Sequence, residues 1–151
     1  MKITPANPYN IQRVDRATAD LQSGSAIAVF TIATGRVLLW GFVGEVTSAI
    51  GTGTTPDLKF QSNPTTGTTT DLCATLNIAD DAAGTLYTMT GVISDALLRS
   101  EHGGVRDPLW GNPFVLPIGA IEAICDENVA GSIRLQAWWM ALDDGATLVA
   151  A

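Results

Sequence analysis

Histidine is the side chain best suited to acid–base chemistry near neutral pH, and this chain has one, His102. Glu101 and Asp107 lie close to it in the sequence, so an acid–base group is one interpretation of the segment. A solvated histidine in a charged, irregular loop is the other. We expect the second, because no nucleophilic Ser or Cys stands at a recognised spacing from His102.

Other patterns for catalysis or metal binding are weak in the sequence. The glycine-rich segment 51–54 lacks the lysine and the following helix of a phosphate-binding loop. Acidic pairs at 80–81, 126–127 and 143–144 offer oxygen ligands, but none has the alternating spacing of a calcium loop. We therefore expect no enzymatic activity, no catalytic residue, no metal and no cofactor.

The tryptophans carry more information. Trp138 and Trp139 are adjacent, so in a regular strand they point to opposite faces, and one of them must meet another sheet, a subunit or water. Trp110 lies in the loop-like segment 107–113. A tryptophan in such a place either folds back as a plug of its own core or anchors the chain in a pocket of a partner.

Composition limits the partners. Eight Lys and Arg against fifteen Asp and Glu give a net charge of −7, and the basic residues are scattered from Lys2 to Arg134. Binding to nucleic acid or to an anionic membrane needs basic residues gathered on one face, so we expect neither partner. Charged residues make up only 15% of the chain, against about 25% in a typical protein. A thinly charged surface favours association with other protein subunits.

Cysteine content and the first residues bear on the compartment. Two cysteines, Cys73 and Cys125, are too few for a disulfide scaffold, and we expect free, partly buried thiols, although the sequence leaves a bridge open. The first eight residues have no apolar run of the signal-peptide kind, and no apolar stretch is long enough to span a bilayer. These features favour folding in a reducing cytoplasm.

Strand patterns dominate from residue 25 onward. Short β-rich runs recur every 8 to 15 residues with turn residues between them, which predicts a single all-β domain over 25–151: a β-sandwich or barrel, jelly-roll-like, of about eight strands. In the long run 36–50, strict alternation puts Leu38, Trp40 and Phe42 on one face and Leu39 on the other. Gly41 and Gly44 interrupt this run and indicate a bulge or a bend.

Residues 1–24 differ from the rest and are predicted to form an N-terminal arm. Ile11, Val14 and Leu21 recur at roughly helical spacing, so a short helix is one interpretation. An extended arm on a neighbouring subunit and a frayed terminus are the other two.

The arm and the long irregular segment 99–113 are the regions we expect to make subunit contacts. A loop of this length in a compact domain is usually functional or disordered. The candidate interface residues are Tyr9, Ile11, Val14, Leu21, Arg99, Arg106, Leu109 and Trp110.

Several segments have the style of a known class of proteins. They are 44–50, 63–67 running into 71–74, 84–91, 117–121 and, at the end, 131–133, Trp138, 140–142 and 145–146. Through them, from about Val43 to its end, the chain resembles small virion proteins of tailed bacteriophages that decorate or cement capsids. The segment 99–113 and the pair 126–127 have no counterpart in that pattern.

The resemblance implies a structural protein, a trimer, that binds the major capsid protein or other virion subunits and stabilises the capsid lattice. Its place would be the virion, after synthesis in the cytoplasm of the host bacterium. A tail or other virion component is an alternative within this class. Outside it, a glycan-binding β-module would use Trp110 and the acidic turns, and a small hydrolase would require His102.

Overall fold

The computed structural model describes residues 10–18, 21 and 24–151. These residues form an all-β domain of twelve strands and one short 3-10 helix, η1. The elements are β1 (Gln12–Ala17), β2 (Ile27–Ala33), β3 (Val37–Ser48), β4 (Asp57–Pro64), β5 (Thr70–Asp71), β6 (Leu76–Asn77), β7 (Leu86–Thr88), β8 (Leu98–Ser100), η1 (Pro108–Gly111), β9 (Phe114–Leu116), β10 (Gly119–Cys125), β11 (Ser132–Ala141) and β12 (Thr147–Ala150).

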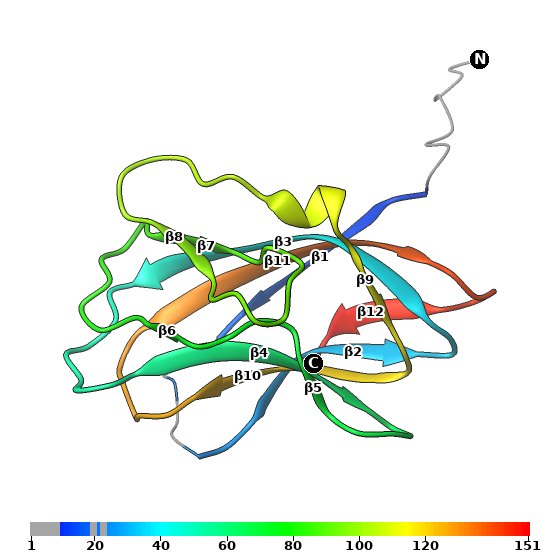
Figure 1. Ribbon diagram of the computed structural model, residues 1–151, viewed down its shortest axis with the longest axis horizontal. Helices are drawn as coiled ribbons and strands as arrows, with labels where there is room; N and C mark the ends of the chain where they lie inside the picture. Colours follow the sequence, from blue (N-terminus) through cyan, green and yellow to red (C-terminus); the bar gives the residue numbers. More distant parts are fainter. Residues whose placement is uncertain (1–9, 19–20, 22–23) are drawn as a thin grey trace.

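The strands make two antiparallel sheets of six strands each, packed face to face (Figure 1). The first sheet has the order β1-β11-β3-β7-β8, with β9 also paired to β3. The second has the order β12-β2-β10-β4-β5, with β6 also paired to β4. The predicted β-sandwich is therefore confirmed, and the alternative of a closed barrel is wrong.

More strands form than the eight expected, because several of them are only two or three residues long. The stretch 69–78, for example, alternates as one strand would, yet it forms β5 and β6 with a break between them. At that break the adjacent residues Leu72 and Cys73 are both buried. The Phe60 N–H donates to the Cys73 Sγ at 3.4 Å, which holds the thiol in the core.

The core lies between the two sheets. Phe42 of β3 meets Phe60 of β4 edge-on, with ring centroids 4.8 Å apart, so one aromatic pair joins the two layers. Cys73 and Cys125 are both buried and free. Burial raises the pKa of the Cys73 thiol to about 11, which suits a packing residue and not a reactive one.

A bulge in β3 changes which side chains reach the core. The pairing with β11 shifts between Trp138 opposite Gly41 and Trp139 opposite Leu39, so one residue of β3 is extra at this point. Leu39 and Phe42 are consequently both buried, and Leu38 and Trp40 lie on the outer side. The expectation that Leu38, Trp40 and Phe42 share a face is wrong for this reason.

Part of the predicted arm belongs to the sandwich. Residues 12–17 are the strand β1 at the edge of the first sheet, paired with β11, so a helix over this stretch is wrong. Leu21 is 1% exposed and its backbone bonds with that of Val129. In the described part of the chain no helix is long and apolar enough to cross a membrane.

Candidate functional site

The segment 99–113 crosses the outer side of the first sheet, where Figure 1 places η1 above β3. Asp107 fastens it there. One carboxylate oxygen accepts from the Leu109 N–H at 3.2 Å and caps η1, and the other accepts from the Phe42 N–H, also at 3.2 Å. Phe42 follows the bulge of β3, so Asp107 bonds a backbone donor at the irregular point of the strand. Burial raises the pKa of Asp107.

Trp110 was expected to be either a plug of its own core or an anchor for a partner, and the plug is instead its neighbour Leu109. Leu109 is fully buried and is the plug of the loop. Trp110 remains 46% exposed and rests on Trp40, with ring centroids 5.7 Å apart and planes tilted by 46°. The Trp40 Nε1–H donates to the Trp110 main-chain carbonyl oxygen at 2.9 Å, which fixes the Trp40 side chain to the backbone of η1.

Gly41, which follows Trp40 in the chain, is the point that Trp110 and Trp138 both approach. A Cβ atom at this position would lie 3.1 Å from the Trp110 Nε1 and 3.2 Å from the Trp138 Cε3. Trp138 is half-buried, whereas its neighbour Trp139 is 4% exposed and faces the core. The two adjacent tryptophans therefore do point to opposite faces, as predicted.

The tryptophans continue into a wider apolar surface. Leu38 of β3 pairs with Val115 of β9 on one side and with Met140 of β11 on the other, and Val115 is 58% exposed. We call this surface the tryptophan face. It consists of Trp40, Trp110, Trp138, Leu38, Val115 and Met140.

Arg99, predicted as an interface residue, has a structural partner. Its Nη1 donates to the Asp81 Oδ1 at 3.0 Å and to the Asn77 carbonyl oxygen at 3.1 Å. Asp81 is buried and also accepts from the Tyr87 hydroxyl. Burial raises the pKa of Asp81 and of Tyr87, and the group ties β8 to the turn before β7.

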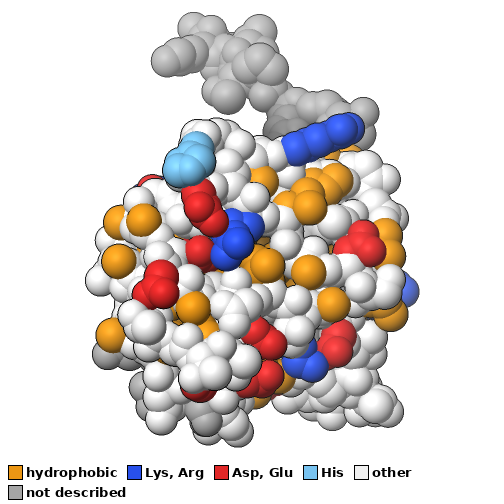
Figure 2. Space-filling view, turned by 60° about the vertical axis from the view of Figure 1, so that its left-hand side comes forward, with side chains coloured by type: hydrophobic (Ala, Val, Ile, Leu, Met, Phe, Trp, Pro, Cys, Tyr) orange, Lys and Arg blue, Asp and Glu red, His pale blue; other side chains and the backbone are white. Residues whose placement is uncertain are grey.

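A hollow of about 340 Å³ beside this group is lined by Asp80, Asp81, Arg99, Glu101 and His102, together with Ala79 and Ala82. Figure 2 looks onto this side, with the histidine in pale blue near its upper edge. His102 is exposed, as expected of a loop histidine. Over residues 10–18, 21 and 24–151, no cluster of three or more His, Cys, Asp or Glu side chains could hold a metal ion.

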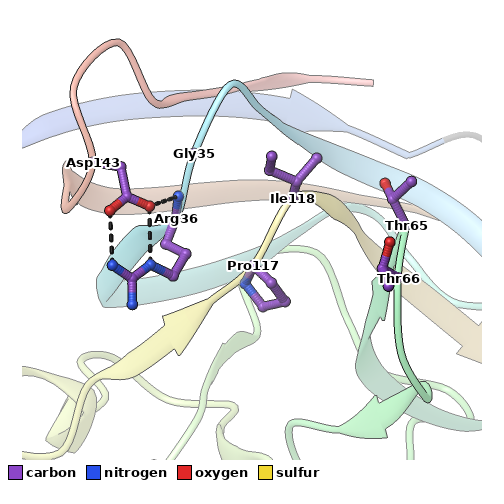
Figure 3. Close-up of a pocket in the computed structure, with 7 residues that line it drawn as sticks. All are labelled: Gly35, Arg36, Thr65, Thr66, Pro117, Ile118 and Asp143. Atoms are coloured by element: carbon purple, nitrogen blue, oxygen red, sulfur yellow. Dashed lines mark hydrogen bonds and ion pairs between the residues drawn. The ribbon is translucent and has the colours of Figure 1, made fainter.

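A second surface feature, which the sequence did not predict, is a pocket of about 390 Å³ at one end of the sandwich (Figure 3). Arg36 and Asp143 form one wall: the Nε and Nη2 of the arginine donate to the carboxylate at 2.9 and 2.8 Å, and its backbone N–H donates at 2.7 Å. These bonds hold the pKa of Asp143 well below its usual range. Pro117 and Ile118 supply apolar surface in the middle of the pocket.

Thr65 and Thr66 stand across the pocket from the ion pair. Gly35 makes the ion pair possible, because a Cβ there would lie 2.7 Å from the Asp143 Cβ. The signal in the sequence is weak: residues 35–36 and 143 are far apart, and only the pairing of β2, β3, β11 and β12 brings their turns together. Its volume falls within the range of ligand-binding clefts, about 300–1,000 Å³, and its lining combines apolar surface with a few polar groups.

The remaining predicted interface residues are spread over the molecule. Ile11 and Val14 are half-buried at the β1 edge, and Val14 packs against the core. Arg106 is exposed, and its carbonyl oxygen accepts from the Thr88 hydroxyl at 2.9 Å. Tyr9 lies outside the described residues. Among the described residues of the predicted set, only Trp110 belongs to the tryptophan face, and its neighbour Leu109 is buried.

No protein-family model, curated protein or solved structure matches this chain.

Proposed function

We propose that this chain is a structural protein that works by packing against other protein subunits, as a virion protein of the capsid-decoration type. It would bind the major capsid protein or another virion subunit and stabilise the lattice. The observation that carries the proposal is the tryptophan face: an apolar surface on the outside of a sheet, with a half-exposed Trp110 whose ring lies against Trp40.

The chemistry of this face suits a protein partner. Aromatic side chains and methionine are enriched where interfaces are fully buried, and charged residues are depleted there. The Trp110 ring already packs against Trp40, whose indole is bonded to the Trp110 backbone, so binding would order few additional side chains. A specific interface of standard size buries about 1,600 Å² in total, and an aromatic anchor near its centre contributes most of the affinity.

The proposal that the chain is not an enzyme is supported by the state of its best candidates. His102 is exposed, and in the hollow beside it the carboxylate of Asp81 is already engaged by Arg99 and Tyr87. Both oxygens of this carboxylate already accept hydrogen bonds within the fold, whereas a general base must reach a proton of the substrate.

Quantitative mass spectrometry of purified particles tests the virion proposal. A copy number of the same order as that of the major capsid protein supports a decoration protein. A much lower copy number would point to a tail or other minor virion component, and absence from particles would contradict the proposal altogether.

A glycan-binding module is the second candidate, because the exposed ring of Trp110 offers a stacking surface for a sugar as well as for a protein side chain. Screening against a glycan array distinguishes a glycan-binding module from a virion protein. A sugar found in this way that also quenches tryptophan fluorescence at micromolar concentration favours the glycan-binding module.

A further inference from the structure

The strand β1 is the outermost strand of the first sheet: among the described residues it pairs with β11 on one side and with no strand on the other, and β12 of the second sheet lies near it without pairing. It is six residues long and contains no proline. An edge strand of this kind exposes backbone donors and acceptors to which another chain can pair.

Side chains along β1 alternate between the two sides of the sheet. Val14 and Arg16 stand opposite Ala137 and Leu135, which are buried, so these two side chains point toward the inside. Arg13 and Asp15 point to the outside, and the Arg13 Nε lies 3.2 Å from the Asp15 Oδ1.

The charges on β1 are arranged so that one strand is complementary to an antiparallel copy of itself. Suppose that a second copy lies antiparallel along β1 with Val14 opposite Val14. Residue 13 of each copy then faces residue 15 of the other, and residue 12 faces residue 16. Arg13 then lies opposite Asp15 of the second copy, on the same side of the sheet. The two Arg13 and the two Asp15 side chains would alternate in sign around the two-fold axis, which is charge complementarity between identical strands.

An unsatisfied atom on the inner side points to the same arrangement. The Arg16 Nε is buried and has no hydrogen-bond partner in the structure described. In the same register Arg16 lies opposite Gln12 of the second copy, and an amide oxygen is a suitable acceptor for this N–H. The pairing would therefore supply a partner to a group that lacks one in the single chain.

We propose that two copies of this chain pair along β1, antiparallel and centred on Val14, so that the two first sheets become one continuous sheet. An inward-pointing charge such as Arg16 also occurs on edge strands that resist pairing. The alternating charges of Arg13 and Asp15 favour pairing instead, because a strand that repels its own copy would place like charges opposite each other.

The contact is isologous, so by itself it gives a dimer. A three-fold contact of the kind implied by the resemblance would have to use another surface, and both contacts together would give a hexamer. The proposal rests on β1 alone and does not depend on whether the tryptophan face binds a capsid.

Charge reversal tests the pairing in solution. We expect dimers or an even-numbered assembly in sedimentation equilibrium for the wild type. Arg13→Asp and Asp15→Arg should each raise the dissociation constant of the dimer contact at least tenfold, because each puts like charges opposite each other. The double variant, and an equimolar mixture of the two single variants, restore opposite charges and should restore association.

Circular dichroism of each variant shows whether it is folded, which is expected because both side chains are exposed. A wild type that stays monomeric at high concentration, or an odd-numbered assembly unaffected by either reversal, would overturn the proposal. Single variants that dissociate without rescue in the mixture would also contradict this register.

A cysteine cross-link tests the register independently. Directly opposite residues in an antiparallel pair have Cα atoms about 4.5–5.5 Å apart, which lies within the range of a disulfide. Val14→Cys should therefore give a covalent dimer on mild oxidation. Asp15→Cys is the matched control, since its two copies would be diagonal neighbours and should cross-link much less. Equal cross-linking of both variants, or none of Val14→Cys, would overturn the proposed centre.

Discussion

The backbone N–H of Phe42 donates to the carboxylate of Asp107 at 3.2 Å, although 65 residues separate the two in the chain. Phe42 belongs to the core strand β3, and Asp107 caps the helix that carries Trp110. This bond couples the bulge in the sheet to the position of the exposed tryptophan.

Asp107→Ala should therefore destabilise the fold. It removes the acceptor of two backbone donors, those of Phe42 and Leu109, and an unsatisfied buried donor costs about 1–3 kcal/mol. We expect a loss of about 2 kcal/mol in the free energy of unfolding, measured by urea denaturation. Asp144→Ala, on an exposed turn, is the control and should change it little. Equal stability of the two variants would contradict this role of Asp107.

Gly41→Ala should disturb the tryptophan face. The new methyl group would lie 3.1–3.2 Å from Trp110, Asp107 and Trp138, so these neighbours must move apart. Overpacking of this kind costs about 1–3 kcal/mol. We expect a lower melting temperature and a changed tryptophan emission spectrum. Gly104→Ala, where nothing lies within 4 Å of the added atom, should leave the spectrum as in the wild type.

The ion pair of Asp143 predicts a dependence of stability on pH. Its pKa in the fold lies below that of the unfolded chain, about 3.9, so its stabilising contribution is complete above that value. The contribution is lost as the pH falls further toward the pKa of the folded state. Asp143→Asn should thus lower the melting temperature at neutral pH and flatten its fall below about pH 4. An unchanged acid profile relative to Asp144→Asn would contradict the assignment.

His102→Ala should leave both the fold and the biological activity intact. The side chain is exposed in a charged loop and would act without an oriented partner. Particle binding and the melting temperature of the variant are the two measurements. If activity were lost while the melting temperature stayed normal, a hydrolase would again be the better hypothesis.

The all-β sandwich was predictable because alternating apolar residues and turn residues recur along most of the chain. That Leu38 and Phe42 lie on opposite sides of β3 was not predictable. A single extra residue at the bulge reverses the alternation, and the glycines in the run do not show where the extra residue is. The place of β1 was missed for a different reason. An edge strand with one partner needs few apolar residues, so 12–17 read as a polar arm.

The interaction site was predictable only in part. The irregular composition of 99–113 singled out Trp110, but the partners that hold it, Trp40 and Asp107, depend on contacts between distant segments. The pocket of Arg36 and Asp143 gave no local signal, since it exists only where four turns meet at one end of the sandwich.

Particle occupancy of Trp110→Ala, compared with its melting temperature, shows whether the chain works by packing through its tryptophan face. Because Trp110 is 46% exposed and Leu109 is the plug, the substitution should lower the melting temperature only slightly. Loss of an aromatic anchor should weaken particle binding by about 2 kcal/mol or more, roughly thirtyfold in the dissociation constant. A large drop in melting temperature with normal occupancy would show that Trp110 is structural and that the interface lies elsewhere.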